Sequence, residues 1–277
     1  MPRFKLAIEY AGTRYSGWQI QKNARTVAGE IERAVRASTG AKTFELYGAG
    51  RTDAGVHAVG QVAHLQLDTR IDEATLLGMI NDELPADINL VDLARAPQRF
   101  HARHDALARS YVYQISRRRT AFAKPFVWWV RDHLDIELMR RAAVSFVGMK
   151  DFRSFSVRDD ENRSTTVQVD AVDLVERDPL VLVRMAGSHF LWRMVRRVIG
   201  VLVAVGRGQL RVEAVASLLD GQSEVPAALT APPSGLFLER VFYRGDPAPD
   251  ALEPMVFGGI GRNARVGNRD QGLGVRR

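Results

Sequence analysis

The chain has 277 residues, of which 46% are hydrophobic and 26% charged, a balance typical of a soluble globular protein with one large or two ordinary domains. It contains no cysteine, which excludes disulfides, thiolate metal sites and cysteine nucleophiles. No apolar run approaches the roughly 20 residues that cross a bilayer, and the N-terminus lacks a secretion signal, so we expect a cytoplasmic protein. A net charge of +7 favours a polyanionic partner such as nucleic acid, although a basic balance is also compatible with solubility alone.

The hydrophobic pattern predicts the same order of elements in each half of the chain. In the first half we expect strand 4–10, helix 26–39, strand 43–48, strand 60–67, helix 73–82 and strand 88–94. In the second half we expect strand 109–115, helix 135–147, strands 165–176 and 179–186, a long helix 189–205, a further helix 211–220, and strand 236–243. Each half is thus βαββαβ, which predicts an α+β fold of two ferredoxin-like (split βαβ) units that share a mainly antiparallel sheet.

These halves divide the chain into three parts. We expect one α+β unit over residues 1–104 and a second over residues 105–245, with a cleft where the two units meet. Residues 246–277 are rich in Gly, Pro and Arg and show no periodicity, which predicts a disordered tail.

The loop at residues 48–60 reads Gly-Ala-Gly-Arg-Thr-Asp-Ala-Gly-Val-His-Ala-Val-Gly and lies between two predicted strands. Its glycines allow the backbone to approach a ligand closely. Asp53 has the type and setting of a nucleophile or general base, and the alternative is an Asx-turn that caps a hairpin. Arg51 shares a face with Asp53 if this segment is extended. There it is suited to hold a phosphate or to fill the gap left by a displaced base, or else it pairs with Asp53 itself.

The predicted strand at 109–115 reads Arg-Ser-Tyr-Val-Tyr-Gln-Ile. Its period of two places Tyr111, Tyr113 and Ile115 on one face. A tyrosine that faces a cleft can stack on a nucleobase, a contact worth about 1–3 kcal/mol. Tyrosines at strand spacing are more often core residues, so this strand is weak evidence by itself.

The predicted helix that follows carries Ser-His-Phe-Leu-Trp-Arg-Met-Val-Arg-Arg-Val-Ile-Gly over residues 188–200. Arg196 has Trp192 and Ile199 as its four- and three-residue neighbours. An unpaired charge among apolar side chains is strongly destabilising, so Arg196 should meet a carboxylate, and we expect that carboxylate to be Asp53. The alternative is that Arg196 reaches solvent along its apolar stem or caps a neighbouring helix.

Together the three motifs resemble those of the tRNA pseudouridine synthase A family. Gly-Arg-Thr-Asp-Ala-Gly-Val-His at 50–57 is similar to the active-site signature of the family, which implies that Asp53 is the catalytic nucleophile and makes His57 a candidate substrate contact. The strand motif implies that Tyr111 lies against the target uracil and is a candidate for proton transfer. The pattern Phe-x-x-x-Met-Val-Arg-x-x-x-Gly implies that Arg196 pairs with the catalytic aspartate.

The resemblance runs from about residue 4 to residue 245. It implies isomerisation of uridine to pseudouridine at tRNA positions 38, 39 and 40, in the anticodon stem-loop, by a homodimer without a metal or an organic cofactor. The chain departs from the first motif of the family, Tyr10 to Gln21, at two positions. Ala11 stands where an acidic residue is usual and Ile20 where a basic residue is frequent, which puts an RNA-contact role of this loop in doubt.

Two other classes of protein stay open from the residues alone. A non-catalytic RNA-binding module would use Tyr111 and Tyr113 as a stacking platform, but it gains nothing from Asp53 in its cleft. A glycosidase-like hydrolase needs a second carboxylate, which the sequence does not supply in a comparable setting. His101 and His104 have metal-like spacing without a third ligand, which favours an RNA-facing or packing pair.

Overall fold

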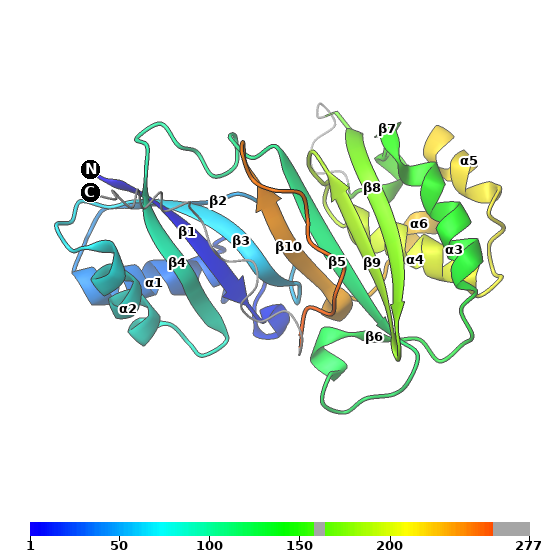
Figure 1. Cartoon of the computed structure of the whole chain (residues 1–277), viewed down its shortest axis with the longest axis horizontal. Helices are drawn as coiled ribbons and strands as arrows, with labels where there is room; N and C mark the ends of the chain where they lie inside the picture. The colour runs from blue at the N-terminus through cyan, green and yellow to red at the C-terminus, as the bar shows by residue number, and fades with distance from the viewer. Residues whose placement is uncertain (158–163, 257–277) are drawn as a thin grey trace, which may run out of the picture.

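The computed structural model describes residues 1–157 and 164–256 (Figure 1). The strands are β1 (Arg3–Tyr10), β2 (Glu45–Gly48), β3 (His57–Gln66), β4 (Ile88–Ala96), β5 (Ala108–Ser116), β6 (Trp128–Trp129), β7 (Gly148–Asp151), β8 (Thr166–Arg177), β9 (Leu180–Gly187) and β10 (Leu236–Phe242). The helices are α1 (Val27–Thr39), α2 (Glu73–Glu83), α3 (Ile136–Ala143), α4 (Met194–Gly206), α5 (Ala214–Asp220) and α6 (Val225–Ala228). In this part of the chain no helix is both long enough and apolar enough to cross a membrane.

The strands form one ten-stranded sheet in the order β4-β1-β3-β10-β5-β9-β8-β7, with β2 beside β3 and β6 beside β5. The first half therefore has the strand order β4-β1-β3-β2, and the second half has the matching order β10-β5-β9-β8. This is the split βαβ arrangement. The predicted α+β fold, with two such units on a mainly antiparallel sheet, is confirmed.

The two halves join at β3 and β10. One edge of β3 is divided between two partners: residues 63–66 pair with β2, whereas His57 and Ala58 pair in parallel with Phe237 and Leu238 of β10. Because β10 also pairs with β5, it joins the strands of the two units into one sheet. The helices lie on one side of this continuous sheet, α1 and α2 over the N-terminal strands and α3 to α6 over the C-terminal strands (Figure 1).

Helix α1 illustrates how local signals fix an element. The hydroxyl of Thr26 accepts a hydrogen bond from the N–H of Gly29, which satisfies one of the free donors at the helix start. Val27, Ile31 and Val35 follow at helical spacing and are fully buried. The helix ends at Gly40, whose φ of 68° is left-handed and suits a residue without a Cβ.

Several elements differ from the sequence-based expectation. Strand β3 begins at His57 rather than at residue 60, so His57 lies within the sheet. Helix α4 begins at Met194 rather than at residue 189, because Arg193 has a φ of 62° and residues 188–193 form a connecting segment. The short elements β6, β7 and α6 were not expected, since two to four residues give no usable periodicity.

The predicted disordered tail is wrong for residues 246–256. Leu252 packs with Val112 of β5 and Leu182 of β9, on the sheet face opposite to the helices. The N–H of Met255 donates to the side-chain oxygen of Gln114 at 2.8 Å. The segment is therefore held by an apolar contact that composition alone does not reveal, and residues 257–277 lie outside the described residues.

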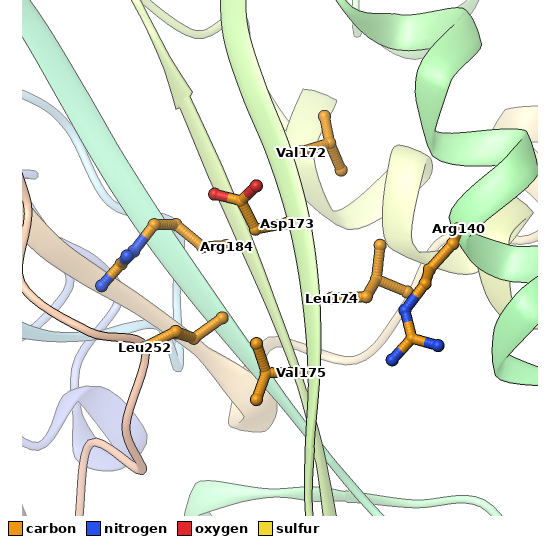
Figure 2. A pocket seen from close by; sticks show the side chains of 7 residues that line it. All are labelled: Arg140, Val172, Asp173, Leu174, Val175, Arg184 and Leu252. Atoms are coloured by element: carbon orange, nitrogen blue, oxygen red, sulfur yellow. The ribbon is translucent and has the colours of Figure 1, made fainter.

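Figure 2 shows the two faces of the C-terminal strands from close by. Arg184 and Val175 lie on the side of Leu252, whereas Val172 and Leu174 point toward Arg140 of α3. These residues, with Asp173, line a small pocket of about 470 Å³ around the outer edge of β8.

A buried ion pair lies under the C-terminal segment. Arg184 of β9 donates from Nε and Nη2 to the two carboxylate oxygens of Glu239 of β10, at 2.9 and 2.5 Å. The third nitrogen, Nη1, donates to the main-chain oxygen of Asp250 at 2.9 Å. Both side chains are less than a tenth exposed, at 7% and 6%. Because β5 lies between β9 and β10, the pair reaches across β5. It connects β9 to β10, the strand of the second unit that borders the first unit.

Candidate active site

A cleft of about 1220 Å³ lies between the loop at residues 48–56, strand β5 and the segment that leads into α4. Four of the residues singled out from the sequence line it: Arg51, Asp53, Tyr111 and Arg196. The cleft, rather than the smaller pocket at β8, is therefore where the candidate chemical groups meet.

The loop that carries Asp53 rests on residues 10–18. The hydroxyls of Tyr10 and Thr52 lie 2.8 Å apart, and the N–H of Trp18 donates to the main-chain oxygen of Thr52 at 3.1 Å. On the other side of Asp53, the N–H of Gly55 donates to the oxygen of Tyr15 at 3.2 Å. The first motif is thus a scaffold for the loop that carries Asp53, a role that the sequence did not reveal.

Two glycines permit this close approach. A Cβ at Gly12 would lie 1.8 Å from the main-chain oxygen of Val56, and one at Gly17 would lie 2.4 Å from that of Thr52. Gly17 also has a φ of 88°, a conformation that residues with a Cβ rarely adopt. Any other residue at either position would push the loop and displace Asp53.

The structure brings Asp53 and Arg196 together. Oδ2 of Asp53 lies 3.3 Å from Nη1 of Arg196, and the two side chains are 21% and 13% exposed. Arg196 lies in the first turn of α4, and its Nε donates to the main-chain oxygen of Ala231 at 2.8 Å. Its guanidinium is therefore fixed at two points, with the carboxylate at the cleft side. Within the described residues no ion pair joins Arg51 to Asp53, which answers the alternative raised from the sequence.

Tyr111 lines the cleft and is 8% exposed. Its ring meets that of Phe190 edge to face, with centroids 5.1 Å apart. Burial raises the pKa of Tyr111 to about 12, while Arg109 lowers and Asp53 raises that pKa to smaller extents. The hydroxyl therefore keeps its proton at neutral pH.

Tyr113 is a core residue. It is fully buried, its hydroxyl donates to the oxygen of Pro232 at 2.8 Å, and its ring packs edge-on against Trp128. Tyr111 and Tyr113 therefore do not form a joint stacking platform, and the non-catalytic RNA-binding alternative loses the feature on which it depended.

His57 lies outside the cleft, contrary to the expectation of a substrate contact. The register pairs His57 with Phe237 and Phe237 with Val112, which puts the imidazole on the face that the C-terminal segment covers. The ring is 1% exposed and stacks on Phe237 at 4.7 Å. Nδ1 accepts from the N–H of Gly12 at 3.0 Å and Nε2 lies 2.9 Å from the oxygen of Pro125, so both nitrogens have protein partners.

This burial predicts a pH dependence of stability. Burial lowers the pKa of His57 to about 4. A histidine in the unfolded chain titrates near pH 6.5, so between these values the unfolded state binds more protons and unfolding becomes easier as the pH falls. We expect His57→Gln to remove about 2 kcal/mol of the acid-induced loss of stability between pH 7 and pH 5. Urea unfolding at the two pH values measures this difference.

The control for this prediction is His133→Gln, which replaces an exposed histidine. It should leave the pH dependence of the unfolding free energy as in the wild type. An unchanged pH dependence in His57→Gln as well would contradict a neutral buried imidazole at this position.

Arg109 is a residue whose importance the sequence did not reveal. Its guanidinium donates to four main-chain oxygens, those of Ala49, Arg103, Ala106 and Ser188. The side chain is 9% exposed and forms no ion pair with a carboxylate in the described ranges. Arg109 thereby ties the start of the Asp53 loop to the segment before α4. A basic residue in a strand that is otherwise buried is the signal by which the sequence could have marked it.

The described residues contain no group of three or more His, Cys, Asp or Glu side chains placed to hold a metal ion. The rings of His101 and His104 lie 4.2 Å apart, and Nδ1 of His101 accepts from the N–H groups of Arg103 and His104. The metal-like spacing in the sequence therefore corresponds to a packed pair of rings.

Comparison with known proteins places this chain in a family. The family model described as tRNA pseudouridine synthase matches residues 6–105 and 142–244. A tRNA pseudouridine synthase A of Geobacter sp. (strain M21) is 40% identical over 246 residues, which are 88% of this chain and 99% of that protein. A tRNA pseudouridine synthase A 2 of Bacillus cereus is 36% identical over 246 residues, 88% of this chain and 100% of that protein. The crystal structure of an archaeal box H/ACA sRNP Nop10-Cbf5 complex aligns at 15% identity with a TM-score of 0.33, over 70% of this chain and 45% of the solved chain.

Sheet, cleft and family match together define an RNA-modifying isomerase. The chain belongs to the tRNA pseudouridine synthase family, and its activity is the isomerisation of uridine to pseudouridine in tRNA.

Proposed function

We propose that this chain makes pseudouridine at positions 38, 39 and 40 of the tRNA anticodon stem-loop, with Asp53 as the nucleophile. The observation that carries the proposal is the carboxylate of Asp53 in the cleft, 3.3 Å from the guanidinium of Arg196. The guanidinium holds the carboxylate in place at the cleft, where a carboxylate can act as a nucleophile. The similarity to proteins named tRNA pseudouridine synthase A supports tRNA as the substrate, and the anticodon stem-loop is the region that the family resemblance of the sequence motifs implies.

The reaction gains and loses no atoms. The bond from N1 of uracil to C1′ of the ribose breaks, the uracil turns, and a bond from C5 to C1′ forms. The proton on C5 leaves and a proton binds N1. We propose that Asp53 adds to the nucleoside and that this covalent step separates bond breaking from bond making.

The target uracil has to leave its stack before Asp53 can reach it, at a cost of a few kcal/mol. We propose that Tyr111 stacks on the extruded base, which returns about 1–3 kcal/mol of that cost. The raised pKa of Tyr111 favours this stacking role over that of a base that removes the proton from C5. Arg51 is exposed at the cleft and has no acidic partner in the described part of the chain, which suits it to a phosphate or to the gap left by the uracil.

We also propose that the enzyme acts as a homodimer in the cytoplasm. The family resemblance supports the dimer, and a tRNA substrate together with the absence of cysteine supports the location.

The test is a pseudouridine map of tRNA from a strain that lacks this gene. Pseudouridine should disappear from positions 38, 39 and 40 while pseudouridines elsewhere in the same tRNAs stay. Full retention at all three positions would refute the assigned sites without affecting membership of the family.

Arg196 is expected to serve both activity and stability. Arg196→Met removes the partner of Asp53 and the donor to Ala231, so we expect turnover to fall by about 10²–10³-fold and the free energy of unfolding by about 1–3 kcal/mol. Arg196→Lys keeps the charge but cannot contact both Asp53 and Ala231 in the same geometry. Its turnover and its free energy of unfolding should lie between those of the wild type and Arg196→Met. Tritium release from uridine labelled at C5 and urea unfolding measure the two effects.

The matched control is Arg33→Met on the surface of α1, where the arginine is 52% exposed and its ion pairs are solvated. Its effect on stability should stay within about 1 kcal/mol, and its activity should equal that of the wild type. If Arg196→Met behaves like this control, the ion pair with Asp53 has no part in the enzyme.

A further inference from the structure

The short segment between β9 and α4 places two unusual residues on the cleft wall. Trp192 and Arg193 line the cleft together with Asp53 and Arg196. Trp192 is 46% exposed, although indole is among the side chains that gain most from burial. Because this exposed ring lies in the wall of the cleft that holds Asp53, it is placed to contact a ligand that enters the cleft.

Arg193 is held in a conformation that arginine seldom adopts. Its φ is 62°, and it is the one non-glycine residue with a positive φ among the residues that the structure describes. Such a conformation is strained for a residue with a Cβ, and it persists where the surrounding structure imposes it, often at functional sites. Here it turns the chain immediately before α4 and leaves the guanidinium over the indole of Trp192, 5.4 Å from the ring centroid.

The backbone of this pair is anchored to neighbouring residues. The main-chain oxygen of Trp192 accepts from the N–H of Val157 at 3.1 Å, and that of Arg193 accepts from the N–H of Arg197 at 3.0 Å. No carboxylate pairs with Arg193 within residues 1–157 and 164–256. The side chains thus present a ring and a guanidinium at a fixed place on the cleft wall.

These two groups are the ones by which proteins hold unpaired nucleotides. Every base has a π-face that stacks on an aromatic ring, and arginine adds stacking of its guanidinium and attraction to the phosphate. Tyr111 is 8% exposed and so lies deep in the same cleft, whereas Trp192 is open to solvent. The cleft therefore has an inner ring and an outer ring.

We propose that Trp192 and Arg193 form a second stacking platform, which holds an unpaired base of the substrate RNA next to the target uridine. The inference rests on the proposed function, because its ligand is the RNA that carries the target. In this arrangement the outer ring, Trp192, stacks on the neighbouring base. The inner ring, Tyr111, stacks on the target uracil. Holding the neighbour in place keeps the target uridine out of its stack.

The kinetic test replaces Trp192 by Leu and by Phe. Trp192→Leu keeps apolar bulk without a ring and should raise KM for tRNA about tenfold or more, with kcat changed less than about threefold. Trp192→Phe should restore KM to within about threefold of the wild type. A KM of Trp192→Leu equal to that of the wild type would overturn the platform.

The matched control is Trp129→Leu. Trp129 is 43% exposed and has the guanidinium of Arg119 5.9 Å from its ring centroid, but it lies outside the cleft lining. Because this exposed Trp–Arg pair lies outside the cleft, replacing Trp129 should have no effect on KM. An equal rise of KM in Trp129→Leu would show that the effect at Trp192 is not specific to the cleft and would overturn the proposal.

Arg193→Gly separates an RNA-binding role from a structural one. Glycine relieves the left-handed strain and removes the guanidinium, so KM should rise several-fold while the melting temperature stays or increases. A lower melting temperature with an unchanged KM would make Arg193 a structural residue and overturn its part in the platform.

A direct readout uses tRNA with 2-aminopurine beside the target position, bound to Asp53→Asn so that no turnover occurs. Stacking on Trp192 should quench the fluorescence at one neighbouring position, and Asp53→Asn combined with Trp192→Leu should abolish that quenching. Equal quenching by both proteins, or none at either neighbour, would overturn the platform. If the wild type releases no tritium from tRNA, it is the proposed function that has failed, so the two failures are distinguishable.

Discussion

Asp53→Asn is expected to reduce tritium release from tRNA labelled at C5 of uridine at least about a thousandfold, because an amide of the same size is not a nucleophile. Binding of tRNA should stay or tighten, since the change removes a negative charge that faces a polyanion. The loop itself should keep its position, because its contacts to Tyr10, Tyr15 and Trp18 do not involve the Asp53 carboxylate. Filter binding and tritium release with the same preparation give both quantities.

The control for this result is Asp82→Asn, which changes an exposed aspartate on α2. Its turnover should equal that of the wild type. Turnover of Asp53→Asn within about tenfold of this control would remove Asp53 from the chemistry.

Arg184→Met is expected to lower the free energy of unfolding by about 3–5 kcal/mol. The substitution keeps most of the apolar bulk but leaves Glu239 with a buried charge and no cation, since both side chains are less than a tenth exposed. It also removes the donor to the main-chain oxygen of Asp250, so the C-terminal segment should loosen. Urea unfolding near pH 7 measures the first effect and hydrogen exchange of residues 250–256 the second.

The double variant Arg184→Met with Glu239→Leu tests the cause. With both charges gone, stability should return to within about 2 kcal/mol of the wild type. Arg117→Met, at a solvated pair in which Arg117 and Glu176 are 36% and 41% exposed, should cost less than about 1 kcal/mol. A single Arg184→Met variant as stable as this surface control would contradict the role assigned to the buried pair.

The sequence predicts best those elements whose start, apolar face and end are marked by residues within or next to the element. Helix α1 has a capping hydroxyl at Thr26, an apolar stripe, and a glycine directly after its last residue, and each of these acts over a few residues. The start of α4 had no such signal. Residues 188–193 have a composition suited to a helix, and only tertiary contacts such as the one from Val157 to the oxygen of Trp192 hold them outside it.

The candidate site likewise contains residues that the sequence predicts and residues whose surroundings it does not predict. Asp53 was found from a compact motif, and Arg196 from the conflict between its charge and its apolar neighbours. Arg109 and His57 depend on residues far away in the chain: Arg109 reaches the oxygens of Ala49 and Ser188, which are 60 and 79 positions distant. Contacts of that range have no periodic trace in a single sequence. For the same reason the packing of residues 246–256 on the sheet was missed.

The most direct test of the Asp53 chemistry is made in cells. A strain that lacks this gene is complemented with either the wild-type gene or the Asp53→Asn allele at equal protein levels, and pseudouridine is mapped at positions 38, 39 and 40 of its tRNAs. Wild type should restore the modification and Asp53→Asn should leave uridine at every one of these positions. Restoration by Asp53→Asn would contradict a carboxylate nucleophile in this cleft.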